Sequence, residues 1–286
     1  MTCSKDFPAA ANKLFNTGYV VNCDRTRGRR RYFVAAQSLL ILLSGAVYGE
    51  ELNSVGLGLS LLSFHYAEFP DDERLRNKET GVLPGINAAL KFSAASWRIG
   101  FSGSAHGGEV DYDGATSAFR PHQTQTDTLI LNGMASVGYE FGADASFTLT
   151  PYGAVGYRFW RRDILPSNGV RGLREDYRWM YAAAGLELGW RKSERFRFGA
   201  DLRLIRPIQA KVDVHITPET TLELGSRTGY RLGLPMLWSL GQRFGLAFEP
   251  YYERQELGAS APKNGILEPS SDTDIFGIHV TARLMF

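Results

Sequence analysis

The last thirteen residues of the chain, DIFGIHVTARLMF, alternate between two kinds of side chain. The even positions from Phe276 to Phe286 are all apolar, whereas the odd positions are mixed and include His279 and Arg283. A period of two places alternate side chains on opposite faces of an extended strand. The sequence therefore predicts a strand over residues 274–286 with one apolar face and one mixed face.

The same alternation recurs along the chain beyond Glu51. About ten segments share it, near residues 54–66, 82–94, 96–110, 124–141, 146–160, 175–190, 195–206, 219–238, 243–256 and 273–286. Short connections such as GADA and RKSE alternate with long polar ones such as DYDGATSAFRPHQTQ. Short turns at one end, long loops at the other and an even strand number are typical of outer-membrane barrels. We therefore expect an all-β, antiparallel up-and-down transmembrane barrel with short periplasmic turns and long extracellular loops.

A soluble β-sandwich also contains alternating strands and is the alternative fold. Three features favour the barrel over the sandwich: a candidate export signal, the regular order of short and long connections, and the position of the aromatic residues. Several aromatic residues lie at the ends of the apolar stripes, among them Tyr139, Trp190, Trp238 and Tyr252. Transmembrane barrels carry aromatic girdles at both membrane interfaces.

The export signal is predicted from the segment RGRRRYFVAAQSLLILLSGAVYGEE, which begins at Arg27. A basic cluster, an apolar run and small residues follow one another there, which is the layout of a secretory signal peptide cleaved after Ala46 or Gly49. An N-terminal membrane anchor is the alternative, but it needs about 20 apolar residues, and this run is shorter. We therefore expect residues 1–49 to be an extension and signal peptide, and residues 50–286 to be the barrel.

The exported part would contain no cysteine, because Cys3 and Cys23 both precede the cleavage site. Disulfide and thiol chemistry are therefore not expected. Removal of seven basic and two acidic residues changes the net charge from +2 to −3, so the charge gives no argument for a nucleic-acid partner. No His or Cys spacing suits zinc and no nucleophile elbow is present, so no metal or cofactor is expected.

A ten-stranded barrel is narrow, since about eight strands leave room only for side chains and wide channels need about sixteen. Eleven charged residues are predicted to form a lumen network: Arg98, Arg158, Glu187, Arg197, Asp201, Arg203, Glu223, Arg227, Arg231, Glu249 and Arg283. Because isolated buried charges are costly and both signs are present, we expect mutual pairing and a largely plugged lumen. A narrow channel that prefers anions, as the excess of arginine suggests, is the alternative.

Two short acidic motifs fall in the predicted long loops. EVDYD contains Asp111 and Asp113 in the second loop, and VDVH contains Asp213 and His215 in the fourth. Alternate residues of an extended segment share a face. The two pairs lie about half a turn apart in a ten-stranded ring, so each could face the other across the barrel mouth.

A phenylalanine that closes an alternating strand, here Phe286, resembles the signal by which bacterial outer-membrane proteins are recognised for assembly. Residues 50–286 resemble a ten-stranded member of that class, and the segments TPYGAVGYRFW, YRWMYAAAGLELGW and EPYYERQEL resemble a widespread, functionally uncharacterised family of such barrels. The resemblance implies a Gram-negative outer-membrane location. It also implies contact with lipid, lipopolysaccharide and the barrel assembly machinery. It implies neither an activity nor a particular partner protein.

The two acidic motifs are similar to those of the omptins, ten-stranded outer-membrane proteases with an Asp pair opposite an Asp–His pair. This resemblance implies that Asp111 and Asp113 help to hold a water molecule, that His215 is the general base and that Asp213 orients its imidazole. It covers these pairs alone, and solvated loop carboxylates or a cation shared with lipopolysaccharide are the alternative. The sequence thus predicts a plugged outer-membrane barrel acting in surface interaction, envelope structure or minor transport, with a rim hydrolase or a narrow channel as alternatives.

Overall fold

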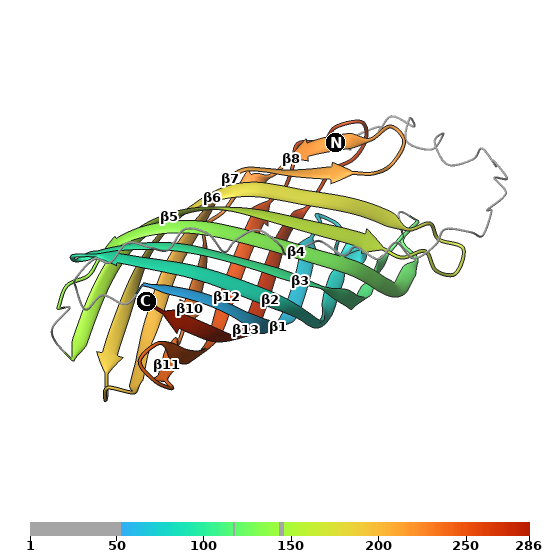
Figure 1. The fold of residues 1–286 in the computed structure, drawn as a ribbon. Coiled ribbons are helices and arrows are strands. Elements are labelled where there is room, and N and C mark those ends of the chain that lie inside the picture. Colours follow the sequence, from blue (N-terminus) through green and yellow to red (C-terminus); the bar gives the residue numbers. More distant parts are fainter. Residues whose placement is uncertain (1–52, 117, 143–145) are drawn as a thin grey trace. The chain divides into compact units, whose positions relative to one another are not determined.

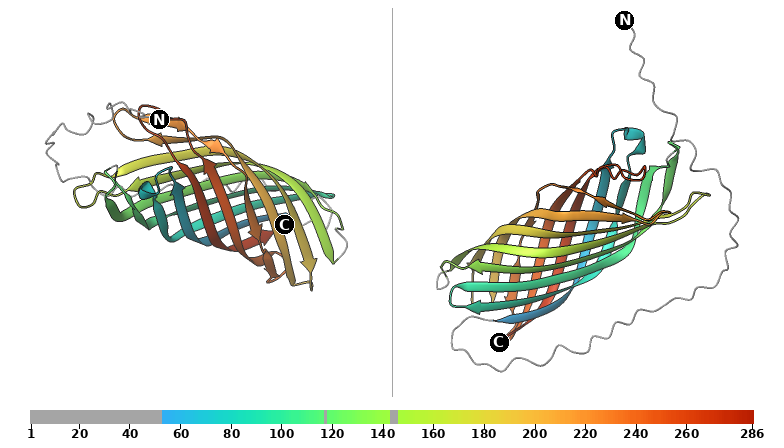
Figure 2. Two further views of the ribbon diagram at one scale, coloured as in Figure 1. Left: turned by 180° about the vertical axis from the view of Figure 1, so that it is seen from behind. Right: turned by 90° about the horizontal axis from the view of Figure 1, so that it is seen from above.

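The computed structural model of the chain describes residues 53–116, 118–142 and 146–286. The expected signal peptide and both cysteines lie outside these residues. Among the described residues, no helix is both long enough and apolar enough to cross a membrane. Most of the described residues belong to antiparallel strands, which close into one barrel (Figures 1 and 2). The predicted all-β up-and-down barrel is confirmed.

The strands follow one another round the barrel in sequence order. They are β1 (Ser54–Phe69), β2 (Lys78–Ala94), β3 (Trp97–Ala115), β4 (Pro121–Tyr139), β5 (Phe147–Ile164), β6 (Leu173–Arg191), β7 (Phe196–Val214), β8 (Thr220–Glu223), β9 (Gly225–Ser226), β10 (Gly229–Gly233), β11 (Met236–Ser239), β12 (Phe244–Gly258) and β13 (Ser270–Met285), with a 3-10 turn, η1 (Glu73–Leu75), after β1. The short strands β8 to β11 share one position between β7 and β12, which gives ten positions in the wall. Pairing of β13 with β1 closes the barrel.

The outer face of the wall changes from apolar to polar part of the way along each long strand. On β3, the outward residues within 97–105 are apolar or glycine, whereas those within 109–113 are all acidic. The inward face changes in the opposite sense, from Ser102 to the buried Val110 and Tyr112. Lipid requires an apolar outer wall. The apolar belt therefore spans the membrane. The part of the barrel with a polar outer face, here called the extracellular extension, projects beyond the belt at the end that carries the longer loops.

Aromatic side chains border the apolar belt on its outer face. At the end with short turns, ring contacts involve Trp97, Tyr139, Phe141, Phe147, Trp190, Phe196, Phe198 and Trp238. At the other border Tyr252 contacts Tyr230 and Phe276. Such girdles mark the two membrane interfaces of a barrel. They bracket the belt that the change of the outer face defines.

A bulge in β7 reverses the alternation of that strand. Gln209 has a φ of 52°, in the left-handed region, and the pairing with β6 shifts between Arg178 and Met180. One extra residue in a bulged strand moves the following side chains to the other face. For this reason Ile205 below the bulge and Val212 above it are both buried inside the barrel.

Candidate functional site

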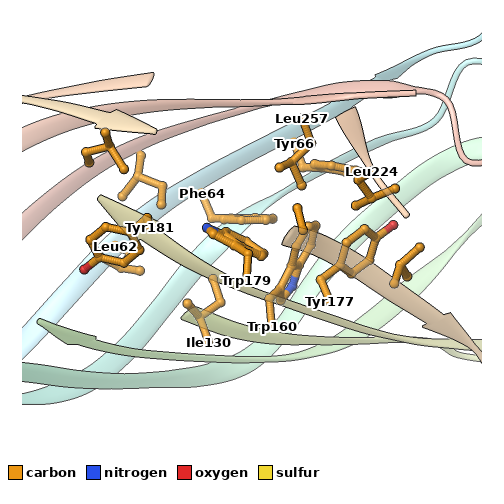
Figure 3. Packing of buried hydrophobic residues seen from close by; sticks show 14 of the residues in the cluster. Leu62, Phe64, Tyr66, Ile130, Trp160, Tyr177, Trp179, Tyr181, Leu224 and Leu257 are labelled. Carbon is orange, nitrogen blue, oxygen red and sulfur yellow. The ribbon is translucent and has the colours of Figure 1, made fainter. Parts of the chain in front are cut away.

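The lumen of the extracellular extension is filled by an aromatic cluster (Figure 3). Trp160 lies at its centre, stacked on Tyr177 at 4.7 Å between ring centroids and edge-on to Phe64 at 5.6 Å. The space left beside Trp160 and Trp179 is about 20 Å³. This is room for about one water molecule. Aromatic side chains therefore occupy the lumen at this level.

Arg162 lies above this cluster with 2% of its surface exposed. Its Nη1 donates hydrogen bonds to Glu68 and Glu175, and its Nε donates one to Glu79, each at 2.7 Å. A fourth carboxylate, that of Glu268 in the loop 259–269, accepts a hydrogen bond from Tyr177 at 2.5 Å. Three buried carboxyl groups from separate strands therefore bond to one guanidinium group, and the carboxyl group of Glu268 lies within electrostatic reach of it.

Burial raises the pKa of Glu268 well above its usual value, and the nearby carboxylates of Glu175 and Glu68 raise it further. Burial also raises the pKa of Glu175, against the lowering effect of Arg162. A buried carboxylate without full compensation takes up a proton rather than keep its charge. Both groups therefore retain protons at pH values at which exposed glutamates have lost theirs.

Charged residues below the aromatic cluster also pair across the lumen. Arg158 of β5 donates hydrogen bonds to Glu253 and Gln255 of β12, both at 2.6 Å. Because β5 and β12 are not neighbours in the wall, these bonds cross the interior. Arg231 pairs with Glu249 at 2.7 Å. The Arg158 bonds hold opposite sides of the barrel together, whereas the Arg231–Glu249 pair joins the neighbouring strands β10 and β12.

The structure places nine of the eleven predicted lumen charges on the inner face: Arg98, Arg158, Glu187, Arg197, Asp201, Arg203, Arg231, Glu249 and Arg283. Glu223 and Arg227 are corrections, because they lie on the outer wall. Glu223 is 82% exposed and lies 3.5 Å from Lys211, and Arg227 approaches Glu256 at 3.9 Å. Both residues lie in the segment of short strands β8 to β11, near the bulge of β7 or above it. At this height the outer face of the barrel is polar, so both side chains point outward.

The two acidic motifs also lie on the outer wall. Asp111 and Asp113 are exposed on β3, because the buried Val110 and Tyr112 occupy the inward positions. Both residues belong to the strand rather than to a loop. The expected Asp pair therefore does not face the barrel mouth.

The second motif, Asp213 and His215 at the end of β7, is held by ion pairs on the outer wall. Asp213 is bound by Arg178 and accepts a hydrogen bond from Thr221 at 2.6 Å. His215 Nε2 lies 2.9 Å from Asp176 Oδ2, not beside Asp213. The structure thus does not bring the two motifs together, which corrects the expectation that they face one another.

The groups that do converge inside the extension were not predicted from the sequence. These are Arg162 with Glu68, Glu79, Glu175 and Glu268. At the other end of the barrel, the backbone N–H of Phe286 donates to the carbonyl of Asn53 at 2.9 Å, and its ring lies on the outer face. Among the described residues, no group of His, Cys, Asp and Glu side chains is arranged to hold a metal ion.

No protein-family model matches the sequence, and no curated protein matches it. Solved structures do match the fold. The outer-membrane protease OmpT from Escherichia coli is similar at a TM-score of 0.54 and 10% identity, over 83% of this chain and 96% of that one. The outer-membrane protein OprG from Pseudomonas aeruginosa matches at 0.42 and 10% identity, over 82% and 96%. The toluene transporter TbuX from Ralstonia pickettii matches at 0.38 and 10% identity, over 83% and 90%.

The likeness to OmpT concerns the fold alone, since the identity is 10%. It agrees with the closed antiparallel barrel and the apolar belt described above. The chain is therefore a β-barrel of the outer membrane, as its alternating sequence predicts.

Proposed function

We propose that this chain is a closed outer-membrane barrel whose extracellular extension is a rigid platform for interactions at the cell surface. The observation that carries the proposal is the packing of the upper lumen, which resembles the core of a soluble protein. Aromatic rings fill it, and Arg162 ties β1, β2, β5 and β6 together through three carboxylates. Such a core supports a fixed shape above the membrane rather than passage through it.

The outer wall of the extension supports the platform role. Asp176 lies between Arg161 at 3.1 Å and Arg174 at 2.9 Å, and Arg178 pairs with Asp213 on the next strand. The three arginine side chains are about two-fifths exposed on the outer wall, whereas Asp176 and Asp213 are buried beneath them. The arginines are therefore the groups available to lipopolysaccharide or to a partner molecule. Outer-membrane lipid around the belt and the assembly machinery at Phe286 complete the proposed set of partners.

The separation of the two acidic motifs gives no support to a hydrolase at the rim. An omptin-like mechanism needs both pairs on one water molecule, whereas here Asp213 is held by Arg178 on one outer wall and Asp111 lies on another. A role in envelope structure is compatible with the same proposal, whereas minor solute transport through the lumen is not, because aromatic side chains fill its upper part.

Ion conductance tests the closed lumen. We expect the refolded chain, inserted in a planar lipid bilayer, to give no conductance steps, because about one water fits beside Trp160. A general porin in the same bilayer is the positive control. Insertion is checked separately by the change in gel mobility on boiling. Regular ohmic steps from the inserted, folded chain would contradict the proposal and favour the channel.

A further inference from the structure

The loop 259–269, which connects β12 to β13, folds as a small hairpin. Lys263 and Ile266 exchange two backbone hydrogen bonds, each at 2.9 Å. The ammonium group of Lys263 donates to the carbonyl of Thr221 at 3.1 Å, which places the tip of the hairpin against β8. Ile266 packs against the aromatic cluster. The loop is therefore an ordered part of the extension that contacts both its wall and its core.

The carboxyl group of Glu268, near the end of this loop, lies in the buried charge cluster around Arg162. The hydroxyl oxygen of Tyr177 is 2.5 Å from a carboxyl oxygen of Glu268 and 3.3 Å from one of Glu175. A tyrosine hydroxyl has one proton and can donate it to only one of these carboxyl groups. The second contact is therefore a full hydrogen bond only if the other carboxyl group carries a proton.

The charge balance of the cluster also favours a bound proton. Among the described residues, its charged and titratable groups come from the loop and from five strands: Glu268 of the loop, Tyr66 and Glu68 of β1, Glu79 of β2, Tyr112 of β3, Arg162 of β5, and Glu175 and Tyr177 of β6. The four glutamates are each at most 5% exposed. Their full ionisation would set four buried negative charges against one positive charge, which is costly. The raised pKa values of Glu268 and Glu175, which burial causes, agree with this balance.

We propose that one proton, held by Glu175 and Glu268 on either side of Tyr177, fixes the loop 259–269 to the barrel, and that loss of this proton releases the loop. After release the carboxylate of Glu268 is hydrated, and its repulsion by Glu175 and Glu68 ends. The inference goes beyond the platform function, because it concerns a change in the surface of the extension and does not depend on what that surface binds.

The direction of the pH dependence follows from the number of protons that each state binds. Between the usual pKa of a glutamate and the raised pKa of Glu268, the docked state binds one proton more than the released state. Docking of the loop is therefore strongest below this interval and weakens as the pH rises through it. For one proton, the equilibrium constant for release increases by at most about tenfold per pH unit.

Tryptic cleavage after Lys263 in the refolded full-length chain, in a nonionic detergent, measures release of the loop. Lys263 is the only lysine or arginine within residues 259–269. The rate is followed by mass spectrometry from weakly acidic to weakly alkaline pH, and it is divided by the rate at which trypsin cleaves a small peptide at the same pH. Cleavage of a transiently released segment follows the population of the released state. We expect the corrected rate to rise with pH, while gel mobility before boiling shows that the barrel stays folded.

Three variants test the role of the proton. Glu268→Gln keeps the shape of the side chain but cannot ionise, so its corrected rate should not depend on pH. Glu223→Gln is the matched control, because Glu223 is an 82% exposed glutamate on β8, and its profile should follow that of the wild type. Tyr177→Phe keeps the ring that stacks on Trp160 but removes the hydroxyl, and it should speed cleavage over the whole pH range.

The wild-type profile and the variants can each overturn the proposal. A corrected wild-type rate that does not change with pH would contradict it. The same rise in Glu268→Gln as in the wild type would contradict it too, as would loss of the rise in Glu223→Gln or cleavage of Tyr177→Phe at the wild-type rate.

Discussion

Replacement of Arg162 by methionine is expected to destabilise the barrel by about 3–5 kcal/mol, the usual cost of removing one partner from a buried ion pair. Methionine keeps much of the side-chain length and contact with Tyr66, but it removes the cation that, among the described residues, is bonded to Glu68, Glu79 and Glu175. These carboxylates are at most 6% exposed, so water cannot replace the guanidinium. Urea unfolding in detergent, followed by gel mobility and tryptophan fluorescence, measures the change in free energy.

Two further variants separate this electrostatic effect from a loss of packing. Arg74→Met removes an arginine from an exposed ion pair with Asp72 and should leave the unfolding transition where it is. Adding Glu79→Gln to Arg162→Met should recover part of the lost stability, because a neutral amide is less costly to bury than an unpaired carboxylate. Equal stability of wild type and Arg162→Met would show that the cluster does not hold the extension together.

Leu59→Arg is expected to destabilise the folded barrel by about 2–4 kcal/mol, as charged residues near the bilayer midplane do on the lipid face of such barrels. Leu59 lies in the middle of the apolar outer row of β1, and 71% of its surface is exposed. In a soluble protein an arginine at so exposed a position would cost little. Equilibrium unfolding in lipid vesicles measures the change in free energy.

Gln125→Arg is the matched control for the lipid-facing position. Gln125 is also exposed on the outer wall, but it lies on β4 above the level at which the outer row becomes polar. We expect its replacement to change the free energy of unfolding in vesicles by no more than the experimental error. Similar effects of the two variants would place the membrane boundary elsewhere.

The membrane-spanning part of the fold is predictable from the sequence because one rule governs it. Outward residues such as Leu57 and Val280 face lipid, so every strand there has an apolar outer row. The alternation alone therefore gives the strands, their order and the barrel class. The aromatic girdles, including Trp190 and Trp238, are predictable for the same reason.

The extracellular extension does not follow this rule, because its outer face is polar and its inner face is apolar. The polar residues around Asp111 and Asp113 are typical of a loop, but they form the solvent-exposed face of β3. Val110 and Tyr112 form the buried face of the same strand. Recognition of Val110 and Tyr112 as an apolar row in their own right would have extended the predicted strand and turned both aspartates outward. The apparent catalytic arrangement depended on placing them in a loop.

Two other features cannot be derived from a periodic pattern. The bulge at Gln209 shifts the phase of β7, and this moves Asp213 to the outer wall. The Arg162 cluster joins residues from four strands and one loop, and their proximity follows from the closure of the barrel rather than from any local spacing.

Labelling of single cysteines from the two sides of the membrane tests the central claim, a lumen closed within the extracellular extension, most directly. Each cysteine is introduced into the full chain with Cys3 and Cys23 replaced by serine, and intact and permeabilised cells are treated with a membrane-impermeant maleimide. We expect Gln125→Cys to react in intact cells, Ser104→Cys to react only after permeabilisation, and Thr128→Cys, which replaces a residue with 1% exposure, to react in neither. Reaction of Ser104→Cys or Thr128→Cys in intact cells would contradict the account, because it would require an open path through the extension.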